Sequence, residues 1–172
     1  MEPRSEDRPL SPEGDERFWA GIGLCAVLAL VVGCLAGALP ATAGDPRPGA
    51  RSGPADAAAM LAWVVLCSAA GVAAFRAVAL VHGRPAGSWA SVSSRAFACA
   101  GVAALVQFVP VPGWHLKLLF DGVAFAAVAA LLARPAFRIG PLDAFAAAAV
   151  ATGIVGVVVG AAAAVTWAAA PR

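Results

Sequence analysis

The stretch LDAFAAAAVATGIVGVVVGAAAAVTWAA, residues 142–169, contains a single charged side chain, Asp143, near its start. A helix needs about 20 apolar residues to cross about 30 Å of hydrocarbon, so this stretch is long enough to span a membrane and to tilt. Pro141 precedes it, at the first helical position that favours proline. The sequence therefore predicts a transmembrane helix over residues 142–169.

Four further apolar blocks precede this one, separated by polar or turn-forming connectors. A soluble domain is about 45–50% apolar and about 25% charged. This chain of 172 residues is 61% hydrophobic and 13% charged, so we expect the lipid bilayer to be its solvent. The sequence predicts an all-α, polytopic bundle with spans at about 18–39, 57–81, 89–109, 114–133 and 142–169. The third block has a short uninterrupted apolar core, so four spans are the alternative.

Residues 1–17 are polar and contain six acids and three arginines. We expect a flexible acidic tail here, with Ser11-Pro12-Glu13 as the signal that starts a helix. A cleaved signal peptide is an alternative to the first span, because Ala41-Thr42-Ala43 resembles a cleavage site. The long acidic segment before the block and the length of the block argue against cleavage.

Lysine and arginine near the spans predict the orientation. With five spans, the side of the N-terminus holds eight of these residues and the other side four, which places the N-terminus in the cytoplasm. Four spans give the same ratio, so charge does not decide the number. The abundance of alanine and the near absence of lysine indicate a GC-rich, bacterial source. We therefore expect a multi-pass protein of the inner (cytoplasmic) membrane.

Asp121 is the main candidate for chemistry inside the membrane, since a carboxylate there is costly unless it is paired, hydrated or protonated. Lys117 lies one turn earlier on the same helix face, and Gln107 ends the preceding block on the same membrane side. These three residues predict either a proton or cation site on a transport path or a structural polar clamp. Arg76 either extends its charge to the interface or pairs with Asp143. Asp143 also suits the positive end of its own helix.

Small residues at intervals of four predict surfaces where helices approach closely, because packing rather than apolar burial drives association in lipid. The first block contains Gly33 and Gly37, and the last block contains Thr152, Gly156, Gly160 and Ala164. These residues pack either within the bundle or against a partner helix or a second copy.

Several classes of site are not indicated. The four cysteines lie inside apolar blocks as small hydrophobic residues, and His82 and His115 fall on opposite sides of a five-span bundle. We therefore expect no metal site and no cofactor. A net charge of +2 does not favour nucleic acid, and no catalytic motif is present. The chain is not expected to be an enzyme.

From Asp56 onward, the order of features resembles the YIP family of five-helix membrane proteins, which has bacterial relatives. The resemblance rests on the long second block, the Gly83–Gly87 connector followed by Ser88-Trp89, a third block running into Pro110, and two closely spaced final blocks. It implies membrane organisation and transfers no site residues. Together with the small-residue surfaces, it favours a scaffold or accessory subunit of a membrane complex. A small ion or solute transporter using Asp121 is the alternative.

Overall fold

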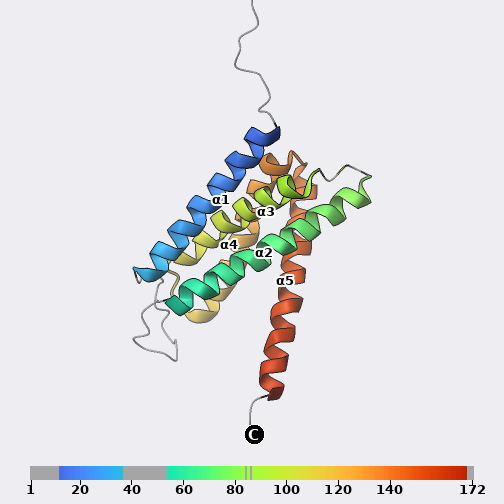
Figure 1. Cartoon of the computed structure of the whole chain (residues 1–172). Helices are drawn as coiled ribbons and strands as arrows, with labels where there is room; N and C mark the ends of the chain where they lie inside the picture. Colours follow the sequence, from blue (N-terminus) through green and yellow to red (C-terminus); the bar gives the residue numbers. More distant parts are fainter. Residues whose placement is uncertain (1–11, 37–53, 84, 86, 170–172) are drawn as a thin grey trace, which may run out of the picture.

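The computed structural model describes residues 12–36, 54–83, 85 and 87–169, and all regular structure within these ranges is helical. Figure 1 shows the arrangement of the helices. They are α1 (Pro12–Leu35), α2 (Pro54–Val81), α3 (Trp89–Ala104), a 3₁₀ turn η2 (Leu105–Phe108), α4 (Trp114–Phe137) and α5 (Pro141–Ala169). The end of the bundle where α1 begins is called the N-terminal end below.

Five helices in the described ranges are long and apolar enough to cross a membrane. This agrees with the five predicted blocks, including the third, which extends from Trp89 to Phe108 when η2 is counted. Large apolar side chains on the outer faces of the helices are exposed, as a lipid solvent favours; they include Leu24, Leu28, Val32, Leu80, Leu119 and Leu131.

The helix starts follow the signals in the sequence. The Ser88 hydroxyl accepts a hydrogen bond of 3.1 Å from the Ser91 backbone N–H, so Ser88 is the N-cap of α3. Gly113 has φ of 81°, a conformation that glycine adopts without steric cost, and α4 starts at the next residue. Polar residues 12–17, at the end of the predicted tail, form the first turns of α1, while residues 1–11 lie outside the described part.

The end of α4 differs from the sequence-based expectation. The helix continues through Pro135 to Phe137, four residues beyond the predicted end at residue 133. Proline removes one backbone donor, but the residues after it can still bond back along the helix. The helix stops where Arg138 takes a left-handed conformation, with φ of 53°, and the Ile139 N–H bonds the Arg134 carbonyl at 3.2 Å.

The third helix, α3, is the central one and packs against α1, α2 and α4. Its mean hydropathy, 1.4, is the lowest of the five candidate spans, and its buried share is the highest. A helix enclosed by other helices meets little lipid, so small side chains replace large apolar ones. Its buried positions are Val92, Ala96, Ala98, Cys99, Ala100, Gly101, Ala103 and Ala104.

Glycines bring α1 and α3 close together. A Cβ on Gly23 would lie 2.4 Å from Phe97 Cδ1 and 3.2 Å from the Ala98 backbone nitrogen. A Cβ on Gly101 of α3 would lie 3.2 Å from Ala26 Cβ of α1. This half of the bundle is therefore tightly packed.

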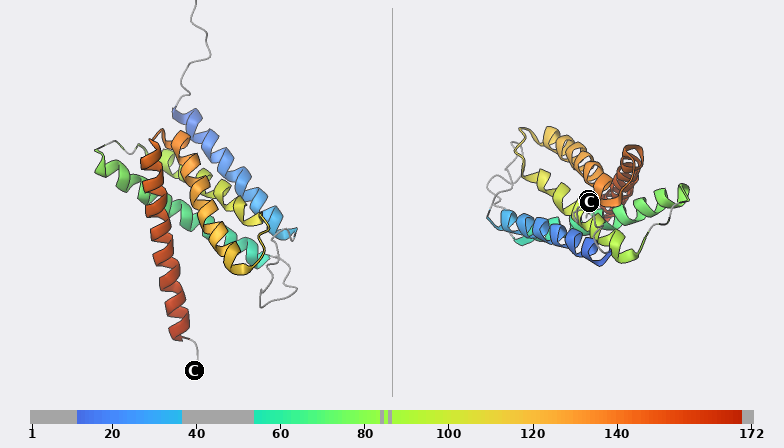
Figure 2. Two further views of the ribbon diagram at one scale, coloured as in Figure 1. Left: turned by 180° about the vertical axis from the view of Figure 1, so that it is seen from behind. Right: turned by 90° about the horizontal axis from the view of Figure 1, so that it is seen from above.

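The last helix, α5, departs from the others. Figure 2 (left) shows α4 and α5 together at the turn that joins them and diverging toward their far ends. Val155 is buried in the main core cluster, whereas the described side chains from Gly156 to Val165 are exposed. The second half of α5 therefore lacks neighbours in the described part of the chain.

Candidate site: a polar clamp beside an apolar cavity

The three residues singled out from the sequence come together at the end of the bundle opposite the N-terminal end. Lys117 Nζ lies 2.5 Å from Asp121 Oδ1, one turn along α4, and 2.9 Å from the main-chain carbonyl oxygen of Gln107 in η2. Only 8% of Lys117 is exposed. Gln107 thus contributes its backbone to this cluster, which the sequence reasoning did not foresee.

The geometry explains why a lysine lies here. The last four carbonyl groups of a helix have no N–H partner within the helix. A basic side chain can donate hydrogen bonds to them and complement the negative end of the helix. Lys117 does this for the end of α3 and η2 while Asp121 balances its charge. The cluster thereby fixes α4 to the end of α3, as a structural clamp would.

Beside the clamp lies an apolar cavity of about 750 Å³ between α2, α3, α4 and α5. Its lining consists mainly of Ala, Gly and aromatic side chains, and its polar members are Gln107, Asp121, Thr152 and Trp63. The Thr152 hydroxyl is already used, since it donates to the Ala148 carbonyl at 2.8 Å. Asp121 thus faces both the clamp and the cavity.

Aromatic rings shape this cavity. Phe75 and Phe137 stack with centroids 4.2 Å apart where α2 and α4 approach the N-terminal end of the bundle, and both line the cavity. Nearer the clamp, Trp63 and Phe125 meet edge to face at 6.3 Å. The Trp63 Nε1 atom is buried and has no hydrogen-bond partner within the described residues. An unpaired buried donor costs about 1–3 kcal/mol. The indole ring lines the cavity, but its nitrogen is buried and has no exposed surface there.

The other intramembrane candidates take separate partners. The Arg76 guanidinium carbon lies 3.4 Å from the centre of the Trp89 ring, a cation–π contact between α2 and the start of α3. Asp143, in the first turn of α5, lies 3.3 Å from His82 Nδ1. Both contacts occur at the N-terminal end of the bundle, and the His82 contact was not anticipated from the sequence.

The two small-residue series have different surroundings. A Cβ on Gly33 would lie 2.6 Å from Phe108 Cζ, so this glycine accommodates a ring within the bundle. Gly37 lies outside the described residues. In α5, a Cβ on Gly156 or Gly160 would meet nothing within 4 Å, and Ala164 is exposed. Thr152, Gly156 and Gly160 line the cavity, so this series begins inside it and continues onto the free part of α5.

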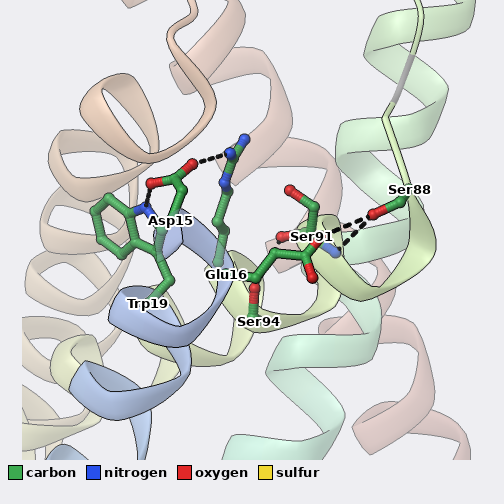
Figure 3. A network of polar contacts seen from close by, with 7 residues as sticks. Asp15, Glu16, Trp19, Ser88, Ser91 and Ser94 are labelled. Carbon is green, nitrogen blue, oxygen red and sulfur yellow. Dashed lines mark hydrogen bonds and ion pairs between the residues drawn. The ribbon is translucent and has the colours of Figure 1, made fainter. Parts of the chain in front are cut away.

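A further polar network, which the sequence reasoning missed, joins α1 to α3 (Figure 3). Asp15 forms an ion pair with Arg95 and accepts a hydrogen bond of 3.1 Å from Trp19 Nε1. The neighbouring Glu16 accepts a hydrogen bond of 3.0 Å from the Ser88 hydroxyl. The available signal was an acidic first turn of α1 and an arginine at the same predicted end of α3.

In the described ranges, no group of three or more His, Cys, Asp or Glu side chains lies close enough to hold a metal ion. The four cysteines form no disulfide within the described ranges; Cys34, Cys67 and Cys99 are buried, and Cys25 is exposed. Comparisons with protein-family models, curated proteins and solved structures found no match.

Proposed function

We propose that this chain is a non-enzymatic integral membrane protein that acts by helix–helix association, as a scaffold or accessory subunit of a membrane complex. The observation that carries the proposal is the free half of α5, defined as residues Gly156–Val165. Its described side chains are exposed, and it contains Gly156, Gly160 and Ala164 at intervals of four.

A second copy of the chain is the partner that fits this surface. Copies inserted into one membrane share an orientation, so their α5 helices would run parallel. Small residues spaced by four allow two parallel helices to approach closely, as in GxxxG dimers, and the same surface on each copy makes the contact symmetric. Larger assemblies could then form on the dimer.

Insertion with the N-terminus in the cytoplasm is part of this proposal. Arg76, Arg95, Arg134 and Arg138 all lie toward the N-terminal end of the bundle, whereas Lys117 lies toward the other end. Basic residues favour the cytoplasmic side. Five helices and a short α4–α5 connection also suit YIP-like membership, which we retain as a proposal, together with a bacterial inner membrane.

Chemical crosslinking of the full chain in membranes tests the association, under reducing conditions that exclude disulfides between copies. We expect the native protein to give a crosslinked dimer, and Gly160→Leu to reduce its yield at least fivefold because the bulkier side chain separates the helices. Val158→Leu is the matched control, since Val158 is 45% exposed and lies about 200° around the helix from Gly160. A protein that stays a lone protomer, or equal yields from both variants, would refute the proposal.

A second candidate function is ion or small-solute transport using Asp121. It is favoured by the position of Asp121, which lines the cavity while its carboxylate contacts Lys117. Proton or ion flux into liposomes that is lost in Asp121→Asn would support transport. Flux that is absent from the native protein would exclude this candidate while leaving the association proposal intact.

A further inference from the structure

The outer face of α4 carries an inference that does not depend on self-association. Exposed residues form this face at intervals of three or four, namely Val123, Ala127, Leu131, Arg134 and the C-cap Arg138. Residues with this spacing share one side of a helix, and none of them lines the cavity. The outer face of α4 is therefore apolar along most of its length and basic at the N-terminal end of the bundle.

The length of the apolar part matches one leaflet of a bilayer. The rise from Val123 to Arg134 is about 16 Å at 1.5 Å per residue, and half of the hydrocarbon layer is about 15 Å thick. The apolar segment that is long enough to cross a membrane runs from Leu119 to Phe137, so Arg134 lies in its last turn and Arg138 directly follows it. An arginine at the end of a span extends its charge to the level of the headgroups. The outer face of α4 therefore presents apolar side chains to acyl chains and guanidinium groups to lipid phosphates.

The two arginines are not engaged by the rest of the described chain. No hydrogen bond or ion pair joins either guanidinium group to a described residue. Backbone groups already form the C-cap of α4, because the Arg134 carbonyl accepts hydrogen bonds from the N–H groups of Arg138 and, at 3.2 Å, of Ile139. Like charges one turn apart repel each other. An anion that contacts both guanidinium groups would relieve this repulsion.

The described acidic side chains at this end of the bundle have partners of their own. Asp15 and Glu16 contact side chains in or beside α3. Asp143 contacts His82. Residues 1–11 contain three acids and two arginines, so their charges nearly cancel. The negative charge that balances the two arginines of α4 is therefore best supplied from outside the chain.

We propose that the outer face of α4 binds one anionic phospholipid, whose phosphate contacts Arg134 and Arg138 while an acyl chain lies along the apolar part. Guanidinium groups suit this phosphate, because their planar set of donors matches its oxygens. A zwitterionic headgroup brings its own cation toward the second arginine, so it is bound less well. The adjoining apolar part selects a lipid over a soluble anion. The site is separate from the free half of α5, so its failure would leave the proposed association intact.

Native mass spectrometry of the purified full chain tests the site, with phosphatidylglycerol and phosphatidylcholine of identical acyl chains as the probes. We expect phosphatidylglycerol to be retained about 25-fold more strongly, from about fivefold for each arginine near the headgroups. Arg134→Gln and Arg138→Gln should each lower the affinity for phosphatidylglycerol about fivefold and leave that for phosphatidylcholine unchanged. Arg17→Gln is the matched control, because Arg17 is exposed at the same end of the bundle but lies on α1, which α3 separates from α4 (Figure 2, right). Equal retention of the two lipids by the native protein, or an equal loss in Arg17→Gln, would overturn the proposal.

Two further measurements test the role of the acyl chain. Soluble glycerol phosphate carries the phosphate without the chains, so we expect it not to displace phosphatidylglycerol at equal concentration. Displacement would show a simple anion site and contradict the assignment of a lipid. Leu131→Asn removes apolar surface beside the arginines, since 61% of Leu131 is exposed, and it should lower the retention of both lipids about threefold or more. Unchanged retention of both lipids in this variant would refute the placement of the chain.

Discussion

Replacing Lys117 by methionine should destabilise the bundle strongly, because Lys117 is the centre of the polar clamp. The substitution removes an ammonium group that contacts the Asp121 carboxylate at 2.5 Å and the Gln107 carbonyl at 2.9 Å. Asp121 would remain with 23% of its side chain exposed and no balancing charge from the clamp. Its carboxylate would then lie unpaired beside an apolar cavity.

The expected cost is about 3 kcal/mol. Breaking a buried ion pair by removing one partner costs about 3–5 kcal/mol. Insertion scales give about 2.5–3.5 kcal/mol for an unpaired aspartate at the centre of a membrane helix, and Asp121 lies nearer the end of α4, which favours the lower part of both ranges. The double variant Lys117→Met/Asp121→Leu removes both charges, so it should lie within about 1.5 kcal/mol of the native protein.

Reversible unfolding in mixed detergent micelles, followed by helical circular dichroism, measures these differences. The two single variants and the double variant form a cycle whose coupling energy should be about 2 kcal/mol. A coupling below about 0.5 kcal/mol would show that the two side chains act independently, and the clamp would then not stabilise the fold.

Two further predictions concern the contact between α1 and α3. Gly23→Ala should cost about 1–3 kcal/mol in the same unfolding assay because its Cβ would clash with Phe97, whereas Gly21→Ala, which has open space, should be neutral or slightly stabilising. Equal effects of the two alanines would refute the close approach. Asp15→Asn should cost about 1 kcal/mol by weakening its half-buried ion pair with Arg95, and loss of the contact should shift the emission of Trp19. Unchanged stability and emission would show that this ion pair does not hold the helices together.

The number of helices and their main limits could be predicted from the sequence because lipid imposes a strong pattern. About 20 apolar residues are needed for each crossing, and polar or turn-forming connectors separate the five apolar blocks. The end of α4 could not be predicted as well. Pro135 is a common signal to stop, yet the helix continues until Arg138 adopts a left-handed conformation.

The candidate site could be predicted only in part. Lys117 and Asp121 lie one turn apart on one helix, so their contact follows from helical geometry. The acceptor role of the Gln107 carbonyl depends on a 3₁₀ turn that leaves this oxygen free, and the composition of the segment does not reveal that turn. The pairing of Asp15 with Arg95 joins residues 80 positions apart and depends on which helices become neighbours.

Glycine spacing shows the same limit most clearly. Gly23 and Gly33 contact aromatic rings, whereas Gly156 and Gly160, which are four residues apart, border open space. The difference arises from the angles between helices, since α1 lies along α3 while α5 diverges from α4. Small residues therefore predict that close approach is allowed, and only the arrangement of the helices tells whether the approach occurs within one chain.

The resulting asymmetry bears on function. The half built from α1 and α3 combines close-packed glycines with an ion pair, although the Arg95 Nε atom is buried without a partner in the described residues. The half built from α4 and α5 borders an apolar cavity and, in the second part of α5, has a helix without neighbours in the described part of the chain. Binding free energy is available where contacts are missing, since an occupant gains contacts without displacing existing ones. Changes in partner binding should therefore result from substitutions in α4, α5 and the cavity face of α2, whereas substitutions between α1 and α3 should chiefly alter stability.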